Sequence, residues 1–375
     1  MVDDFEKFIS DFGEPVFDET EDSFNIDMDW VDKTPLKVLF AHFPPSMSGI
    51  GGDCFPLFFS KLFPNATVHI TYDKGRIVTP SEFIDMFRSF EVKDGQISEM
   101  GTHLDSEYDI IIGRSSSFNC MHERDSHRKL IENSGFPVNI KPIHLSNREH
   151  SERYCDLVFP DDFGVGSTPS PLFRNSAISF LNNTEKQKLV LFCGQIHPCK
   201  NQLDYIRNLD SGLCEDYSFV FLGQPSGSPE YLNAIKKECI EKGIGHYIIT
   251  GVEHELIPYF MALSQIQVVN SDPEQSIQFD RFDRPIRQRY DPLPRVLGEA
   301  AASDVHSVCS IATLYSPDLA QFVTQYNHKS YKDLNDTFEN ALKIDARGYH
   351  KKMITLEERC KEIIDIIMGE YNGKL

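Results

Sequence analysis

Residues 188–224 carry the sequence KLVLFCGQIHPCKNQLDYIRNLDSGLCEDYSFVFLGQ. Two apolar runs, KLVLFCG from Lys188 and YSFVFLG from Tyr217, lie on either side of a helical candidate, NQLDYIRNL. Near-continuous apolar runs of this length are typical of strands that are buried on both faces of a parallel sheet. The stretch therefore predicts a strand–helix–strand unit with parallel strands.

The same alternation continues on both sides of this stretch. Three more strand-like runs follow it: HYIITG from His246, IQVVN from Ile266 and HSVCSIA from His306. Four precede it: KVLFAHF from Lys37, TVHITYD from Thr67, DIIIG from Asp109 and VNIKPIHL from Val138. The pattern predicts an α/β fold of two Rossmann-like doubly wound domains. Their ligand sites are expected where the carboxyl ends of the strands face a cleft between the domains.

The length of 375 residues also exceeds the usual size of one hydrophobic core. We expect an acidic N-terminal leader at 1–35, a first domain at 36–175, a linker at 176–187 and a second domain at 188–345. Residues 346–375 are predicted to be helices that can cross back to the first domain. The leader is rich in aromatic residues, which are candidates to dock on the main body.

Composition narrows the class of protein. The formal net charge is −20, which disfavours binding to nucleic acid or to an anionic membrane surface. Nine cysteines occur singly, with no CxxC pair, as expected for reduced thiols in a cytoplasmic protein. No apolar run approaches the roughly 20 residues of a membrane span, so we expect no integral membrane segment.

Four segments of the second half resemble a known family. LFCGQIHPCKNQLDYI, FVFLGQPSGSPEYLNAIKK, GIGHYIITGVEHELIPYFMALSQI and DPLPRVLGEAAASDV follow the order and spacing of glycosyltransferase family 4, the group 1 glycosyltransferases of GT-B fold. The resemblance covers about residues 188–315, and FPPSMSGIGGD carries it in the first half.

The resemblance implies an acceptor domain followed by a donor-nucleotide domain. The expected activity is transfer of a sugar from a UDP-, GDP- or other nucleotide sugar to a glycan, glycoprotein or glycolipid. The family also implies retention of configuration, with neither a metal nor a cofactor.

The segment DPLPRVLGEAAAS corresponds to the family's pair of acidic residues. By resemblance, Glu299 would accept hydrogen bonds from the ribose hydroxyls and Asp291 would hold hydroxyls of the donor sugar. Carboxylates are acceptor-only groups, which suits the binding of a diol. The helix that begins near Arg295 and includes Leu297 would direct its amides and its dipole at the diphosphate.

The remaining site residues are also implied by the resemblance. Lys200 would neutralise the leaving diphosphate, next to Gly194 and Gln195 in the loop after the first strand of this half. The backbones of Gly223 and of Gly251–Val252 would flank the nucleobase. Gly51 and Gly52 would approach the donor phosphates from the first domain, because glycine permits close contact with the backbone.

Three positions depart from the family pattern. Gln195 stands where the family has an arginine, Asp291 where it has a glutamate, and Pro294 where it has a glycine. A nearby insertion, with Arg295 just beyond it, brings five arginines into fifteen residues: Arg281, Arg284, Arg287, Arg289 and Arg295. One of them is predicted to reach the donor phosphates, where it would replace the missing charge, or an anionic acceptor. A solvated loop, in which these arginines pair with neighbouring carboxylates, is the alternative.

Two other functions remain open at this stage. The three departures also fit a catalytically silent GT-B relative that acts as a partner subunit. An NAD-dependent oxidoreductase is less consistent with the sequence, because Cys54 occupies the last position of the glycine fingerprint. Among the histidines, we considered His122, His144 and His197 as candidate bases.

Overall fold

The computed structural model describes residues 4–16, 32–41, 55–72, 97–99, 106–113, 125–140, 152–160, 163, 168–169, 171–225, 229–272, 278–279, 285–286, 291–292 and 294–374. The chain divides into two compact units. The first unit comprises residues 23–170 and 355–375, and the second comprises residues 1–22 and 171–354.

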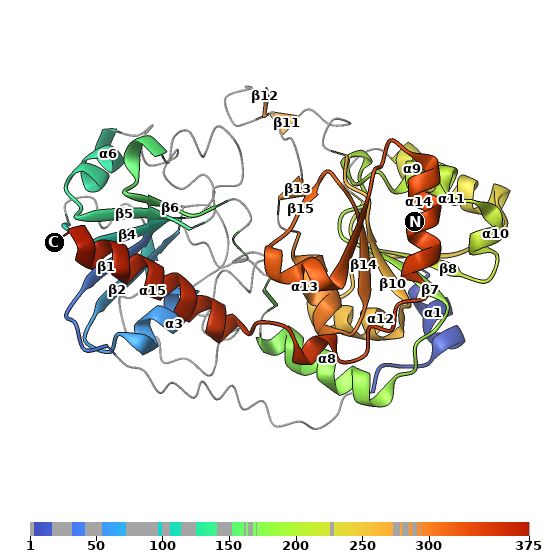
Figure 1. Ribbon diagram of the computed structural model, residues 1–375, viewed down its shortest axis with the longest axis horizontal. Helices are drawn as coiled ribbons and strands as arrows, with labels where there is room; N and C mark the ends of the chain where they lie inside the picture. Colours follow the sequence, from blue (N-terminus) through green and yellow to red (C-terminus); the bar gives the residue numbers. More distant parts are fainter. Residues whose placement is uncertain are drawn as a thin grey trace. The chain divides into compact units, whose positions relative to one another are not determined.

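A six-stranded parallel sheet forms the centre of the first unit, in the order β3-β2-β1-β4-β5-β6. Its strands are β1 (Lys37–Ala41), β2 (Thr67–Tyr72), β3 (Ile97–Glu99), β4 (Ile110–Gly113), β5 (Phe136–Asn139) and β6 (Leu157–Val158). The helices described here are α3 (Phe55–Leu62), α6 (Asp125–Glu132) and the last helix of the chain, α15 (Leu356–Lys374). Apolar residues of α3 and α15 share one core with the sheet, and Figure 1 shows both helices beside β1 and β2.

The second unit also contains a six-stranded parallel sheet, in the order β16-β14-β10-β7-β8-β9. Its strands are β7 (Leu189–Cys193), β8 (Ser218–Leu222), β9 (Gly245–Ile249), β10 (Ile266–Val269), β14 (His306–Ser310) and β16 (Val323–Tyr326). Counted along the chain, both sheets have the order 3-2-1-4-5-6, which is the doubly wound Rossmann arrangement. The strand order reverses between β1 and β4 in one sheet and between β7 and β10 in the other.

Apart from the N-terminal helix, the helices described in the second unit lie before, between or after these strands in sequence. They are α8 (Pro171–Asn183), α9 (Gln202–Asn208), α10 (Ser211–Cys214), α11 (Pro229–Glu241), α12 (Ile257–Leu263), α13 (Arg295–Ala302) and α14 (Tyr331–Ala341). The described residues of this unit also form the short 3₁₀ helices η3 (Pro198–Lys200), η4 (His254–Leu256), η6 (Pro317–Phe322) and η7 (Tyr349–Lys351). Two small additional pairings join β11 (Gln278–Phe279) to β12 (Pro285–Ile286) and β13 (Asp291–Pro292) to β15 (Thr313–Leu314).

Helix α8 differs from the sequence-based expectation. The linker expected at 176–187 overlaps this helix, and the second unit begins again at Pro171. Phe173, Ala177 and Phe180 are buried in its core, at spacings of four and three that place them on one helical face. Because polar residues separate these three apolar residues, the helical periodicity is weak in the sequence and the segment resembles a linker.

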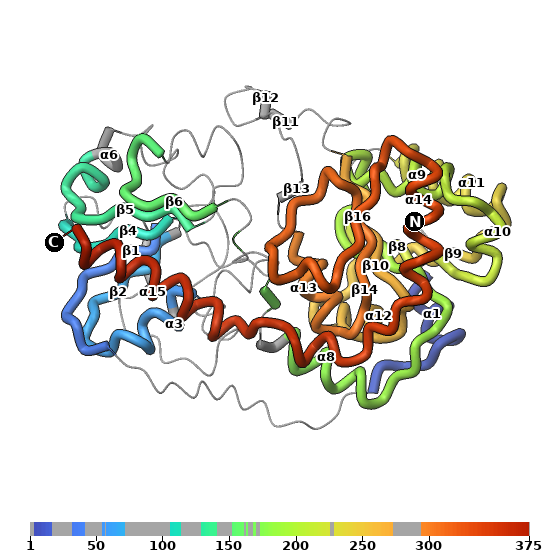
Figure 2. The backbone as a smooth tube through the Cα atoms, viewed as in Figure 1, coloured from blue at the N-terminus to red at the C-terminus, as the bar shows by residue number. Residues whose placement is uncertain are grey.

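The N-terminal helix α1 (Phe5–Phe12) docks on the edge strand β9 of the second unit (Figure 2). The Ile248 amide donates to the Asp4 carboxylate at 2.9 Å, and the Asp4 amide donates to the Ile248 carbonyl at 3.3 Å. Phe8 is completely buried against Tyr247 and Phe260. Because an edge strand presents unpaired backbone groups, α1 protects this edge of the sheet.

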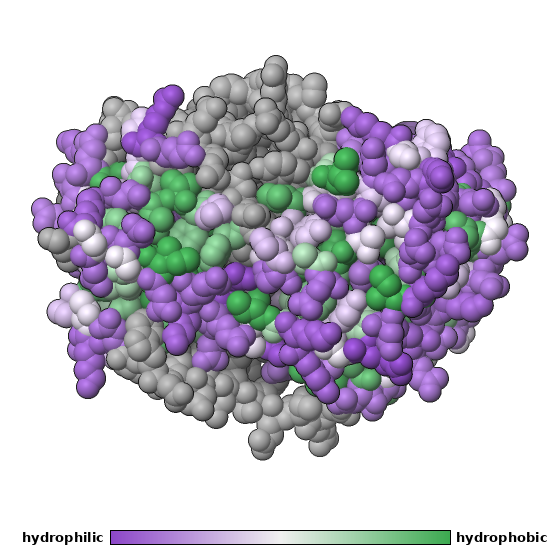
Figure 3. All heavy atoms as spheres, in the orientation of Figure 1, coloured by the Kyte–Doolittle hydropathy of each residue, from purple (hydrophilic) through white to green (hydrophobic). Residues whose placement is uncertain are grey.

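None of the helices in the described part of the chain is long and apolar enough to cross a membrane. The visible surface of the second unit is mainly hydrophilic (Figure 3).

His306, at the start of β14, is a buried histidine with two partners. Its Nε2 atom lies 2.8 Å from the Thr324 hydroxyl, and its Nδ1 atom lies 3.1 Å from the Tyr349 hydroxyl. Burial lowers the pKa of His306 to about 4. An unfolded histidine has a pKa of about 6.5, so between these values the unfolded chain binds a proton that the folded chain does not.

The contribution of His306 to stability is therefore complete above pH 6.5 and is lost as the pH falls toward 4. Between pH 7 and pH 5 we expect His306 to account for a fall of about 2 kcal/mol in the free energy of unfolding. Urea unfolding of the wild type and of His306→Asn at both pH values measures this difference, with His246→Asn as the control. An equal pH dependence in wild type and His306→Asn would contradict it.

Candidate functional site

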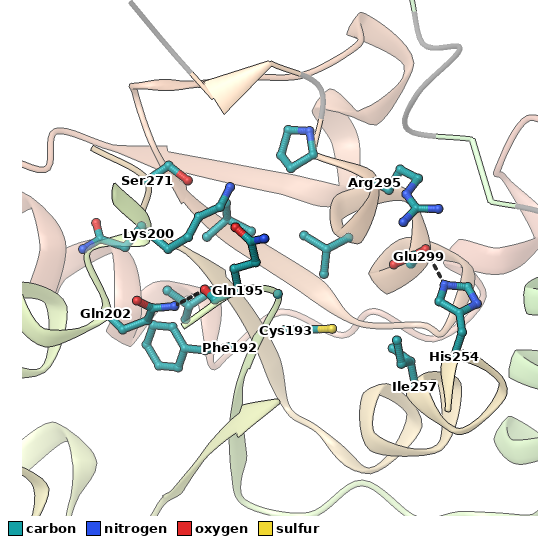
Figure 4. Close-up of a pocket in the computed structure, with 16 residues that line it drawn as sticks. Phe192, Cys193, Gln195, Lys200, Gln202, His254, Ile257, Ser271, Arg295 and Glu299 are labelled. Atoms are coloured by element: carbon teal, nitrogen blue, oxygen red, sulfur yellow. Dashed lines mark hydrogen bonds and ion pairs between the residues drawn. The ribbon is translucent and has the colours of Figure 1, made fainter. Parts of the chain in front are cut away.

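A pocket of about 360 Å³ lies at the carboxyl ends of β7 and β10, where the strand order of the second sheet reverses. In open α/β sheets this reversal point is where ligands bind. The pocket is lined by the ends of β7 and β10, by the start of α13 and by the segments around Lys200 and His254 (Figure 4).

The loop after β7 is held close to the loop after β8. The Gly194 amide donates to the Leu222 carbonyl at 2.9 Å, and the Ile196 amide donates to the Gln224 carbonyl at 3.0 Å. Gly223 has a φ of 151°, and a Cβ atom there would lie only 1.8 Å from the Gly194 carbonyl oxygen. A glycine is therefore required at position 223 for the two loops to approach each other this closely.

The backbone around Lys200 is fixed to the end of β10. Asn270 donates from its side chain to the Asn201 carbonyl at 2.8 Å, and the Asp272 amide donates to the Cys199 carbonyl at 2.9 Å. The Tyr326 hydroxyl in turn donates to the Asn270 side chain. These bonds hold Lys200 at the carboxyl end of β10. Its side chain and that of Gln195 extend into the same part of the pocket (Figure 4).

Helix α13 directs its N-terminus at the pocket. Pro294 precedes the helix, and no side chain among the described residues caps it. Arg295 and Val296 of the first turn line the pocket. The free amides and the dipole of a helix N-terminus favour an anion. Together with the guanidinium of Arg295 and the ammonium of Lys200, they make this part of the pocket suited to a phosphate group.

Glu299 lies one turn further along α13 and is only 6% exposed. Its Oε1 atom is 3.3 Å from Nε2 of His254. Burial alone would raise the pKa of Glu299, but the hydrogen bond from His254 and the charges of Arg295 and His254 lower it below its usual value. The carboxylate is therefore ionised at neutral pH, and its oxygens are suited to accept hydrogen bonds from the donor groups of a ligand.

No protein-family model matches the sequence, and no curated protein matches it. Solved structures do match. AviGT4, a glycosyltransferase involved in avilamycin A biosynthesis, shares 15% sequence identity over 90% of this chain and 99% of its own, with a TM-score of 0.55. A UDP-forming α,α-trehalose-phosphate synthase from Burkholderia vietnamiensis shares 10% identity over 91% of this chain and 100% of its own, with a TM-score of 0.56. HepE from Anabaena, solved with UDP and glucose, shares 11% identity over 90% of this chain and 98% of its own, with a TM-score of 0.52.

The fold is that of GT-B glycosyltransferases. The predicted fold class, two Rossmann-like doubly wound domains, is confirmed. The second unit is the second Rossmann-like domain of this GT-B chain, and its pocket occupies the reversal point of the sheet.

The GT-B pocket brings together five of the residues that the sequence proposed: Gly194, Gln195, Lys200, Arg295 and Glu299. The other candidates of this unit with described side chains do not line it. Gly223 supports the neighbouring loop, and Gly251 has a φ of 74° in the turn after β9. Val252 packs on a hydrophobic core, and Leu297 is completely buried, with its amide donating to the Pro294 carbonyl at 3.1 Å.

Several candidates fall outside the described part of the GT-B chain. These are Gly51 and Gly52, together with Arg281, Arg284, Arg287 and Arg289. Only the backbone of Asp291 is described, paired with Thr313 in parallel register. Of the five arginines, Arg295 is the one that the structure describes, and it lines the pocket. That one of the five contacts a phosphate remains a prediction.

Sequence reasoning missed His254, the partner of Glu299. The available signal was its position three residues after Gly251, which the sequence had already placed near the nucleobase. Of the histidines that were considered, His122 and His144 lie outside the described residues. His197 accepts a hydrogen bond from the Cys199 amide at 3.2 Å and caps η3, which is a structural role.

Proposed function

We propose that the chain is a glycosyltransferase that uses a nucleotide-diphosphate sugar as its donor. The main support is the combination of groups in one pocket. Two cationic side chains and a helix N-terminus lie near a buried, ionised carboxylate at the reversal point of the sheet. A nucleoside diphosphate has the complementary groups, with an anionic diphosphate next to a ribose diol.

In this proposal Lys200, Arg295 and the amides of α13 bind the diphosphate, while Glu299 accepts hydrogen bonds from the ribose hydroxyls. The bond between the anomeric carbon and the diphosphate breaks as the acceptor oxygen bonds to that carbon, and the acceptor proton passes to an oxygen of the departing diphosphate. The side chains stabilise the charge on the leaving diphosphate, so catalysis is mainly electrostatic and positional.

Further parts of the proposal rest on the resemblance to glycosyltransferase family 4. Asp291 would hold the donor sugar, Gly51 and Gly52 would approach its phosphates, and the loop at Gly251–Val252 would flank the base. Transfer would be retaining and metal-independent, in a cytoplasmic protein, with a glycan, glycoprotein or glycolipid as acceptor.

A thermal-shift panel of UDP- and GDP-sugars tests donor binding, and an assay of donor hydrolysis tests catalysis. We expect at least one nucleotide sugar to raise the melting temperature and to be hydrolysed slowly without an acceptor. Stabilisation without hydrolysis or transfer would instead support a catalytically silent relative. No stabilisation by any member of the panel would contradict the proposal.

Arg295→Ala tests the charge at the start of α13. Losing a close contact between a guanidinium and a phosphate costs on the order of 1.5–3 kcal/mol, or roughly 10- to 150-fold in affinity. We expect a loss of this size for UDP in calorimetry. Arg207→Ala, which removes a surface arginine paired with Glu238, is the matched control. An unchanged affinity in Arg295→Ala would exclude Arg295 from phosphate binding.

A further inference from the structure

His254 is the one side chain for which the structure gives a hydrogen bond to the Glu299 carboxylate, among the described residues. The two residues are 45 positions apart in sequence and meet at the wall of the pocket. A buried carboxylate needs hydrogen-bond donors, because burial without them is costly. His254 provides such a donor and leaves other acceptor positions of the carboxylate for a ligand.

The imidazole ring is itself held in place. It packs on Phe173 of α8, with the ring centroids 5.6 Å apart and the planes at 53°. The backbone of η4 supports it through the Leu256 amide, which donates to the Glu253 carbonyl at 3.0 Å. In Figure 4, His254 lies below Glu299, and its ring points at the carboxylate. The side chain of His254 is 24% exposed, so it is partly shielded from competing water.

The position of His254 along the chain links two parts of the pocket. It begins η4, shortly after the Gly251–Val252 turn at the end of β9, whereas Glu299 belongs to α13. The hydrogen bond therefore joins the loop that is proposed to flank the base to Glu299, the residue of α13 that is proposed to bind the ribose. A change in this bond would alter the orientation of the carboxylate without altering the charges around the diphosphate.

We propose that His254 is a positioning residue that orients Glu299 for recognition of the ribose diol of the donor. This inference rests on the proposed function of the pocket. It extends that function by assigning the selectivity for ribose hydroxyls to a pair of residues instead of to Glu299 alone.

Two variants separate positioning from packing. His254→Phe keeps an aromatic ring against Phe173 but has no donor, whereas His254→Gln keeps an N–H donor of similar reach. Calorimetry compares two probes, UDP and 2′,3′-dideoxyuridine diphosphate, which lacks both ribose hydroxyls. His246→Phe is the matched control, because His246 lies on β9 and does not line the pocket.

We expect His254→Phe to weaken UDP binding about tenfold, the effect of one hydrogen bond to a charged group, and to leave the dideoxy probe within about twofold. His254→Gln should restore most of the UDP affinity. Equal losses for both probes, or no rescue by glutamine, would overturn the positioning role. If the wild type binds neither probe and no nucleotide sugar, both the proposed function and this inference are overturned.

Discussion

We expect Glu299→Gln to lower the affinity for UDP by roughly 10- to 150-fold, because one charge-assisted hydrogen bond to the ribose is lost and such a bond contributes about 1.5–3 kcal/mol. The substitution preserves the volume of a side chain that is only 8% exposed. It removes the negative charge that His254 and Arg295 stabilise, and it replaces one acceptor oxygen with a donor. Isothermal calorimetry measures the affinity, and thermal unfolding shows whether the fold is retained.

Glu255→Gln is the matched control for this prediction. Glu255 is an exposed carboxylate on η4, next to His254, and it does not line the pocket. The control should bind UDP as the wild type does. If Glu299→Gln also binds with wild-type affinity, Glu299 does not contact the ligand, and the ribose must be recognised elsewhere.

Lys200→Met is expected to reduce kcat by roughly 100- to 1,000-fold, the usual effect of removing one group that stabilises developing charge in a transition state. The Michaelis constant should change much less, because the ammonium matters most when the diphosphate leaves. The backbone of this segment is held by Asn270 and Asp272 through bonds that do not involve the Lys200 side chain, so the fold should be retained.

Steady-state kinetics with the best donor from the nucleotide-sugar panel measures both constants. Lys188→Met is the control, since Lys188 is a surface lysine that pairs with Asp216. A change confined to the Michaelis constant would make Lys200 a binding residue only, and the leaving-group role would be wrong.

The central sheets could be predicted from the sequence because their signal is local. Runs such as those of β7 and β8 are apolar at almost every position, as strands covered by helices on both faces must be. Lys200, Arg295 and Glu299 could be proposed because the short segments that contain them resemble glycosyltransferase family 4. The doubly wound order then brings the strand ends to one edge of the sheet.

Tertiary structure alone decided the contacts between residues that are distant in sequence. Tyr247 donates to Asp11 across 236 positions at 2.6 Å, and Asn270 anchors Asn201 across 69 positions. No local periodicity encodes such pairs, because each arises when separate elements pack together. For the same reason the segment that forms α8 was predicted to be a linker, because its apolar face is defined by what it packs against. The hydrogen bond between His254 and Glu299 likewise becomes visible only in the folded chain.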